Sequence, residues 1–174
     1  MFELKYNLRE HAITDGRYDW DMKFLNLAKH ISSWSKDPST KCGAVIVDRH
    51  RRVISTGYNG FPANITDSSE RYENRETKYK YVVHADMNAI LFSHVSIEDL
   101  TIYTYPLPPC SRCTVHIIQT KLTRVVSVIP NEGVLTRWGE DLIEANSLLE
   151  EAGIYFNAYS IDEVGLFHMK QINV

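Results

Sequence analysis

The chain has 174 residues, a formal net charge of −3 and three cysteines. This length suits one domain with a substantial core, and the weak negative charge excludes an overall basic field for wrapping nucleic acid. No apolar run approaches the roughly 18 residues of a membrane span, and residues 1–10 are charged, so we expect neither a membrane span nor a signal peptide. Three cysteines cannot all pair internally, which favours a reducing cytoplasm.

The first expected element is an amphipathic helix. Apolar side chains recur at steps of three and four from Trp20 to Trp34, which is the spacing of one helix face. Two strands are expected next, over 42–47 and 53–58, and the polar turn between them predicts a hairpin. Cys42 begins an apolar run and is expected to be a core residue.

The segment from Pro62 to Lys80 is polar and charged and has no steady hydrophobic period. Its composition favours a solvated loop. The alternative is an ordered flap that covers a ligand or meets a neighbouring subunit, because long loops in compact domains tend to be functional or disordered.

Strands and helices alternate over the rest of the chain, which we expect to form a single domain over residues 1–174. An antiparallel pair followed by strand–helix–strand units predicts a mixed sheet with helices on both faces. A terminal helix fits 164–172. The other expected elements are strands over 100–105, 124–129 and 154–159 and helices over 83–93, 111–120 and 138–152, the last closed by Gly153.

Two short motifs carry chemistry: residues 84–86 read His-Ala-Asp, and residues 109–113 read Pro-Cys-Ser-Arg-Cys. One imidazole and two thiolates suit zinc, and a site with three protein ligands leaves its fourth position open for water, as catalytic zinc does. Both motifs stand at expected helix N-termini, where the helix dipole favours thiolates. We therefore expect His84, Cys110 and Cys113 to bind one zinc ion.

Simpler interpretations exist for each of these residues alone. A Cys-x-x-Cys pair alone is as typical of a redox dithiol or a structural zinc site as of a catalytic zinc site. A lone histidine is more often a core or surface residue than a metal ligand. If His94 or His116 were a fourth protein ligand, the zinc site would be structural rather than catalytic. Neither stands in the first turn of its expected helix, which favours the open arrangement.

Asp86 is the candidate proton carrier. Zinc-dependent base deaminases carry His-x-Glu followed by Pro-Cys-x-x-Cys, and their Glu transfers protons without binding the metal. The chain meets every element of this signature except that Asp86, one methylene shorter, stands in place of the Glu. Zinc lowers the pKa of a bound water to about 7. Asp86 is expected to accept that proton and to pass it to the ring nitrogen and the leaving amine.

Further segments of the sequence indicate which family of deaminases the chain resembles. From about Trp20 to Phe156 the chain resembles the deoxycytidylate (dCMP) deaminases, a branch of the cytidine deaminase-like superfamily. The zinc motifs mark only the superfamily, whereas Ser-Lys-Asp-Pro and Gly-Tyr-Asn-Gly-x-Pro indicate the dCMP branch. The segments that carry the resemblance are Ser35–Thr40, Gly43–Val47, Gly57–Pro62, Lys78–Tyr81, His84–Ile90 and Pro109–Cys113.

The resemblance implies a three-layer α/β/α fold with a mixed five-stranded sheet. It implies hydrolysis of dCMP to dUMP and ammonia by a cytoplasmic enzyme that forms a homo-hexamer. It further implies activation by dCTP and inhibition by dTTP, with Mg²⁺ accompanying the triphosphate. Membranes and nucleic acids are not expected as partners.

The resemblance also assigns residues to nucleotide binding. Asn59 matches an asparagine that holds the sugar, since an amide can donate to and accept from a hydroxyl; the alternative is a turn residue in Asn-Gly. Ala85 is expected to contact substrate. Arg112 departs from common family members and is interpreted as a substrate phosphate contact or an intersubunit charge. The candidate effector-binding residues are Lys36, Asp37, Ser39, Lys41, Gly60 and Phe61.

The Asp at position 86 keeps a second hypothesis open. A weakened or silent homologue would bind deoxynucleotides as a regulatory or sensing module and release no ammonia. Deaminases of tRNA or single-stranded DNA share the zinc motifs, but they need an electropositive path for phosphates. Deaminases of free cytidine also share them, and the two branch-specific segments argue against that substrate.

Overall fold

The computed structural model describes residues 16–160; the terminal helix expected over 164–172 lies outside them. None of the helices in this described part is long and apolar enough to cross a membrane. The elements, in chain order, are α1 (Arg17–Ser32), β1 (Gly43–Val47), β2 (Val53–Tyr58), α2 (Ser69–Glu73), α3 (Arg75–Tyr81), α4 (Ala85–Leu91), β3 (Thr101–Tyr105), α5 (Ser111–Gln119), β4 (Arg124–Val128), α6 (Glu132–Glu151) and β5 (Tyr155–Tyr159).

The five strands form one mixed sheet in the order β2-β1-β3-β4-β5. The strand β1 is antiparallel to both neighbours, β2 and β3, whereas β3, β4 and β5 run parallel. The predicted hairpin and the predicted mixed sheet are confirmed. Because β2 and β3 are both antiparallel to β1, they run in the same direction, and α4 and α5, which come after them in the chain, begin at the same edge of the sheet. Residues 84–86 and 109–113 lie at this edge.

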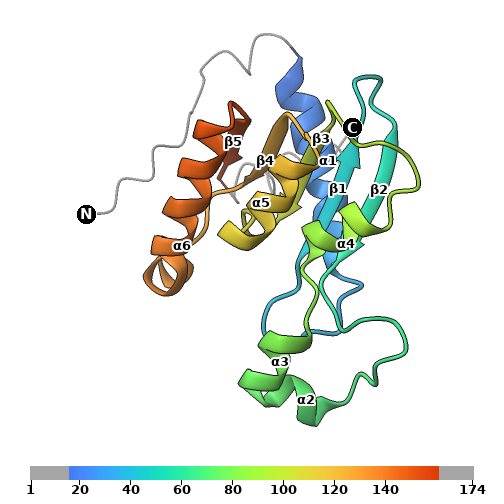
Figure 1. Cartoon of the computed structure of the whole chain (residues 1–174), viewed down its shortest axis with the longest axis vertical. Coiled ribbons are helices and arrows are strands. Elements are labelled where there is room, and N and C mark those ends of the chain that lie inside the picture. The colour runs from blue at the N-terminus through green and yellow to red at the C-terminus, as the bar shows by residue number, and fades with distance from the viewer. Residues whose placement is uncertain (1–15, 161–174) are drawn as a thin grey trace, which may run out of the picture.

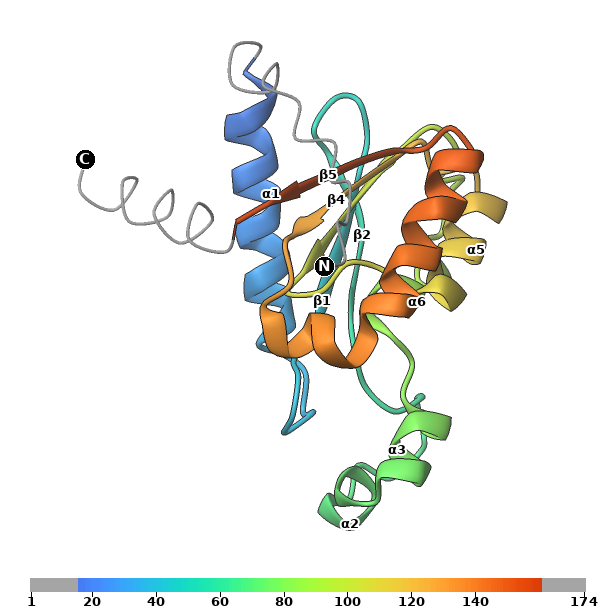
Figure 2. The same ribbon diagram turned by 90° about the vertical axis from the view of Figure 1, so that its left-hand side faces the viewer.

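Helices cover both faces of the sheet (Figures 1 and 2). Val45 and Val47 point to the α1 side, where they join a core cluster with Met22 and Leu25. The alternate residues of β1 point to the other side and pack with Ala89 of α4 and Ile117 of α5. Successive side chains of a strand point to opposite faces of the sheet, so a strand with helices on both sides buries the side chains on both of its faces. The three-layer α/β/α expectation is confirmed.

Several helix boundaries differ from the prediction: α4 spans 85–91 rather than 83–93, and α1 and α6 differ at one end. The helix α1 ends at Ser32, so Trp34 lies beyond it, is 51% exposed and contacts the Tyr58 ring edge-on. The helix α6 begins at Glu132 rather than 138, because the Asn131 side chain accepts a hydrogen bond from Val134 N and caps it.

The segment expected to be a loop over 62–80 contains two short helices instead. The side chains of Ser68 and Asn74 cap α2 and α3 by accepting bonds from the backbone N–H groups of the first turns. We call residues 61–82 the α2–α3 insertion; it projects from the body of the protein (Figures 1 and 2). At its base, Gly60 and Val83 exchange two backbone hydrogen bonds, of 3.1 and 2.8 Å.

Candidate active site

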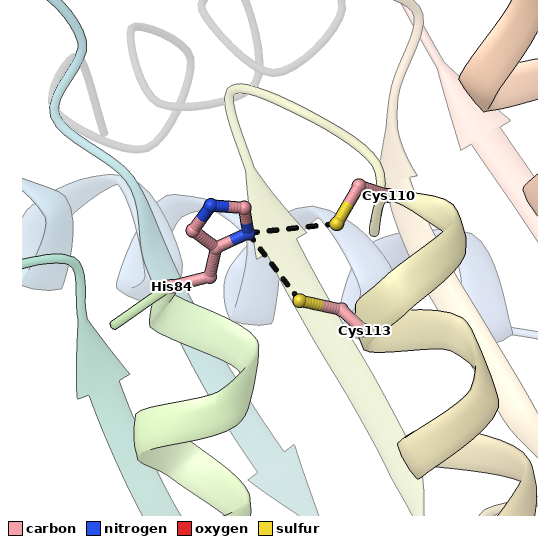
Figure 3. A group of neighbouring side chains, drawn as sticks. All are labelled: His84, Cys110 and Cys113. Carbon is pink, nitrogen blue, oxygen red and sulfur yellow. Dashed lines mark hydrogen bonds between the residues drawn. The ribbon is translucent and has the colours of Figure 1, made fainter. Parts of the chain in front are cut away.

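Three metal-type donors converge at the starts of α4 and α5. His84 is the N-cap of α4, Cys110 is the N-cap of α5, and Cys113 lies in the first turn of α5. His84 Nδ1 lies 3.5 Å from Cys110 Sγ and 3.3 Å from Cys113 Sγ (Figure 3). Within residues 16–160, these are the three side chains of the His, Cys, Asp and Glu types whose donor atoms lie within 4.8 Å of one another.

The geometry of this group fits zinc. Tetrahedral zinc with Zn–N near 2.05 Å and Zn–S near 2.3 Å places nitrogen and sulfur about 3.5 Å apart, which is the separation that the His84 and cysteine atoms have. Neither His94 nor His116 joins the group. The imidazole of His116 is hydrogen bonded at 2.7 Å to the carbonyl oxygen of Arg112 instead. The donor set therefore has three protein ligands and room for a fourth.

The two thiols differ in acidity. The hydrogen bond from Cys113 lowers the pKa of the Cys110 thiol to about 4, and the same bond raises the pKa of the Cys113 thiol. The hydrogen bond with Cys110 raises the pKa of His84 above its ordinary value. One thiolate is thus already stabilised by its neighbours, and a metal that binds both sulfurs would release a proton.

The position of His84 depends on a close approach between α4 and β2. A Cβ atom on Gly57 would lie 2.2 Å from the carbonyl oxygen of Ala85 and 2.3 Å from the backbone nitrogen of Ala89. Only a residue without a side chain permits this contact. The Asn88 amide adds a 2.7 Å hydrogen bond to the carbonyl oxygen of Tyr58, so the first turn of α4 is fixed against the sheet.

The carboxylate of Asp86 is close to the metal-type donors but is not one of the group. Its side chain is buried, lines the cavity described below, and accepts a 2.9 Å hydrogen bond from Met87 N at Oδ1. Burial raises the pKa of this carboxyl above its ordinary value. A carboxyl group in this place is suited to proton transfer.

His84 and Cys110 open onto a cavity of about 680 Å³, lined by residues of the helices α2 to α6, of the end of β3 and of the loops before β1, after β2 and after β3. Pockets of about 300–1,000 Å³ accommodate small-molecule ligands. Arg75, Arg112 and Arg137 line this cavity and supply positive charge. The rings of Tyr79 and Trp138 meet edge-on, with centroids 6.1 Å apart, and join the α2–α3 insertion to α6.

Sequence analysis missed the contribution of α6 to this cavity. For residues 62–80 it offered an ordered flap over a ligand as the alternative to a solvated loop, and residues of the insertion line the cavity. Residues such as Arg75, Tyr79, Arg137, Trp138 and Asp141 follow no motif that could have indicated a role. These residues share only their place on the cavity wall. That place becomes evident only when the insertion and α6 are seen packed beside the metal-type donors.

The predicted substrate contacts all reach the cavity. Ala85 and Arg112 line it, as does Asn59. The buried Asn59 side chain accepts a 2.7 Å hydrogen bond from Cys42 N and donates one of 2.9 Å to the carbonyl oxygen of Thr40. Cys42, expected in the core, is half-buried: it packs against the core cluster that contains Ala44 and Ile46, and it also lines the cavity.

The six candidate effector residues are divided among different surroundings. Asp37 and Ser39 line the same cavity as the metal-type donors. Lys36 forms an exposed ion pair with Asp67 at 2.8 Å, and Lys41 is exposed. Gly60 belongs to the bridge at the base of the insertion, and Phe61 stacks on Tyr72 with ring centroids 4.3 Å apart. Their role in effector binding stays a prediction.

Residues 18–129 match the family described as the cytidine and deoxycytidylate deaminase zinc-binding region. The chain belongs to this deaminase family. An uncharacterised deaminase of Aliivibrio fischeri is 40% identical over 135 residues, which cover 78% of this chain and 90% of that protein. The deoxycytidylate deaminase of Mus musculus is 30% identical over 152 residues, covering 84% and 83% of the two chains.

Among solved structures, the fold of this deaminase is similar to that of the dCMP deaminase from cyanophage S-TIM5 in complex with dCMP and dUMP. The TM-score is 0.63 over 79% of this chain and 94% of that chain. The sequences are 19% identical, so this likeness concerns the fold and confirms the expected deaminase architecture.

Proposed function

We propose that this deaminase hydrolyses dCMP to dUMP and ammonia. The observation that carries the proposal is the convergence of His84, Cys110 and Cys113 beside the buried Asp86 carboxylate, at a cavity of about 680 Å³ that His84, Cys110 and Asp86 line. Family membership and relatives named deoxycytidylate deaminase support the choice of substrate.

In this proposal the imidazole and the two thiolates hold one zinc ion. When bound, zinc supplies Lewis acidity and makes water a competent nucleophile at neutral pH. Asp86 accepts the proton that the attacking water loses and donates it to the ring nitrogen beside the amino group. Water oxygen becomes the carbonyl oxygen of the pyrimidine, the carbon–nitrogen bond breaks, and the amine leaves as ammonia after a second proton transfer through Asp86.

The nucleotide is held by groups on the cavity wall. The Arg112 guanidinium lines the cavity and suits the 5′-phosphate, since guanidinium groups form paired, charge-assisted hydrogen bonds with phosphate. The bond from Asn59 Nδ2 to Asp37 is long, at 3.4 Å, and a sugar hydroxyl can replace it. Ala85 contacts the base from the first turn of α4.

Regulation and assembly form a second part of the proposal. We propose a cytoplasmic homo-hexamer that dCTP activates and dTTP inhibits, with Mg²⁺ on the triphosphate. The support is the resemblance of Ser35–Thr40 and Gly57–Pro62 to the dCMP branch.

The decisive experiment follows the ultraviolet loss of the cytosine amine in zinc-loaded protein supplied with dCMP. Parallel reactions contain dCTP plus Mg²⁺, and deoxycytidine serves as a control without phosphate. The proposal requires turnover of dCMP, much weaker turnover of deoxycytidine, and stimulation by dCTP. If the protein binds zinc and dCMP but releases no ammonia, it is instead a silent homologue in which Asp86 does not perform the proton transfer of the expected Glu.

A further inference from the structure

We propose that Lys78 is a positioning residue for substrate binding, which acts through Asp37 on the carboxamide of Asn59. The inference rests on the proposed function, because it takes the cavity to bind a nucleotide and Asn59 to contact its sugar. All three side chains line the cavity, and the reaction described above does not use Lys78 or Asp37.

The ion pair between Lys78 and Asp37 is buried. Lys78 Nζ lies 2.8 Å from Asp37 Oδ1, and the two side chains are 11% and 3% exposed. Transfer of two charges out of water is so unfavourable that the attraction between them often gives no net gain in stability. Stability is therefore a weak explanation for this pair, and its place on the cavity wall points to a role in geometry.

The Asp37 carboxylate connects Lys78 to Asn59. Its Oδ1 also accepts hydrogen bonds from the backbone nitrogens of Ser39 and Thr40, at 2.8 and 3.1 Å, and its Oδ2 lies 3.4 Å from Asn59 Nδ2. The loop before β1 thereby encloses the Asn59 carboxamide, with the nitrogen toward Asp37 and the oxygen toward Cys42 N. Lys78 fixes the carboxylate that holds this loop, and the loop in turn orients the carboxamide through the carbonyl oxygen of Thr40 and the backbone nitrogen of Cys42.

The pair also couples the α2–α3 insertion to Asn59. Lys78 lies on α3, and a second ion pair, between Lys36 and Asp67, joins the same loop to the insertion at 2.8 Å. That second pair is exposed, and exposed pairs contribute little energy. The buried pair is the side-chain contact through which a displacement of α3 would reach the Asn59 carboxamide.

Charge gives a further reason why Lys78 matters for an anionic ligand. Without its ammonium, the Asp37 carboxylate would remain as an uncompensated negative charge beside a cavity that must accept a phosphate. An unpaired carboxylate would also compete for the Asn59 amide hydrogens that a sugar hydroxyl needs. Both effects weaken nucleotide binding and leave the metal-type donors and Asp86 in place.

The test compares Lys78→Met and Lys78→Arg with the wild-type, zinc-loaded protein. For Lys78→Met we expect KM for dCMP and Kd for dUMP to rise about tenfold, the equivalent of 1.4 kcal/mol, with kcat and zinc content unchanged. Lys78→Arg keeps the positive charge and should recover most of the affinity.

The matched control is Arg124→Met, which breaks another buried ion pair. Arg124 bonds Asp21 at 2.6 Å, with side chains 15% and 1% exposed, and ties α1 to β4. Neither residue lines the cavity. A purely structural role for Lys78 predicts equal KM changes in Lys78→Met and Arg124→Met, and that result would overturn the proposal, as would an unchanged KM in Lys78→Met.

Two further arms keep the outcome clear. If Lys78→Met does not fold, the double variant Asp37→Asn/Lys78→Met leaves no buried unpaired charge; its KM should still be raised, and a wild-type KM overturns the proposal. If wild-type protein binds dUMP but does not turn over dCMP, the proposed reaction fails, and the dUMP Kd values alone decide the role of Lys78. Absence of both turnover and dUMP binding overturns both proposals.

Discussion

Asp141 on α6 and Ser111 at the start of α5 are joined by two hydrogen bonds to one carboxylate. The Ser111 backbone nitrogen donates over 3.1 Å and its hydroxyl over 2.5 Å. The first N–H groups of a helix need acceptors from outside it, and Cys110, the N-cap of α5, provides no side-chain bond. The helix α6 thus supports the turn that carries two of the three metal-type donors.

This relationship predicts that Asp141→Ala weakens metal binding without removing a ligand. Groups that orient metal ligands typically contribute about 10–100-fold in affinity, and we expect a loss in that range by competition with a chromogenic zinc chelator. Glu140→Ala changes the exposed neighbouring residue on α6 and should leave the affinity unchanged. Equal zinc affinity in both variants would show that Asp141 does not hold the Cys110 turn.

The close approach at Gly57 gives a second prediction. A methyl group there collides with the backbone of Ala85 and Ala89, so Gly57→Ala should displace the first turn of α4. A displacement of roughly 1 Å can reduce activity about 10²-fold, and we expect such a loss in kcat/KM for dCMP.

The control for this prediction is Gly139→Ala on α6, where an added methyl group meets nothing within 4 Å. This change should raise the free energy of unfolding by about 0.4–1 kcal/mol without affecting kcat/KM. Wild-type activity in Gly57→Ala would mean that α4 does not need this contact to position His84.

Substitutions of Asp86 separate proton transfer from metal binding. Asp86→Ala should abolish measurable turnover, because general acid–base catalysis contributes about 10²–10⁴-fold, and should leave the zinc content intact. Asp86→Glu should preserve or raise kcat. Substantial ammonia release by Asp86→Ala would remove this carboxylate from the mechanism.

Thiol reactivity provides a test of metal binding that needs no activity. Burial raises the pKa of Cys42 to about 12, so this thiol carries almost no reactive thiolate until the pH approaches that value. We expect zinc-loaded protein to react slowly with a thiol reagent near neutral pH. Zinc removal should make one of the three thiols, Cys110, reactive, because its pKa is lowered. The buried Cys113, whose pKa is raised, and Cys42 should react only on denaturation. Rapid reaction of all three in the presence of zinc would contradict the proposed site.

Local patterns were enough to predict the sheet and the metal-type donors. Val45 and Ile46 belong to a short apolar run that could only be a buried strand, and Cys110 and Cys113 have a spacing that the first turn of a helix brings together. These two features depend on neighbours within a few residues in the chain. The addition of His84, which lies 26 residues before Cys110, rested on the deaminase signature.

Other features depend on capping and on distant contacts. The helix α2 has no hydrophobic period, and its start depends on one hydrogen bond from Arg71 N to Ser68. Gly133 and Gly139 lower helix propensity in the first half of α6, which explains why its start was predicted too late. The pairing of Asp141 with Ser111 joins residues 30 positions apart, and a single sequence does not indicate which partner such an aspartate has.

The two hydrogen bonds between Gly60 and Val83 have a consequence for how this protein can diverge. They close the insertion at its neck, so its two ends stay side by side whatever lies between them. Lengthening a closed loop adds only about 0.6 kcal/mol for each doubling of its length. Substrate preference can therefore be altered by exchanging the residues of the α2–α3 insertion. His84, Cys110 and Cys113 keep the same supporting structure when this happens.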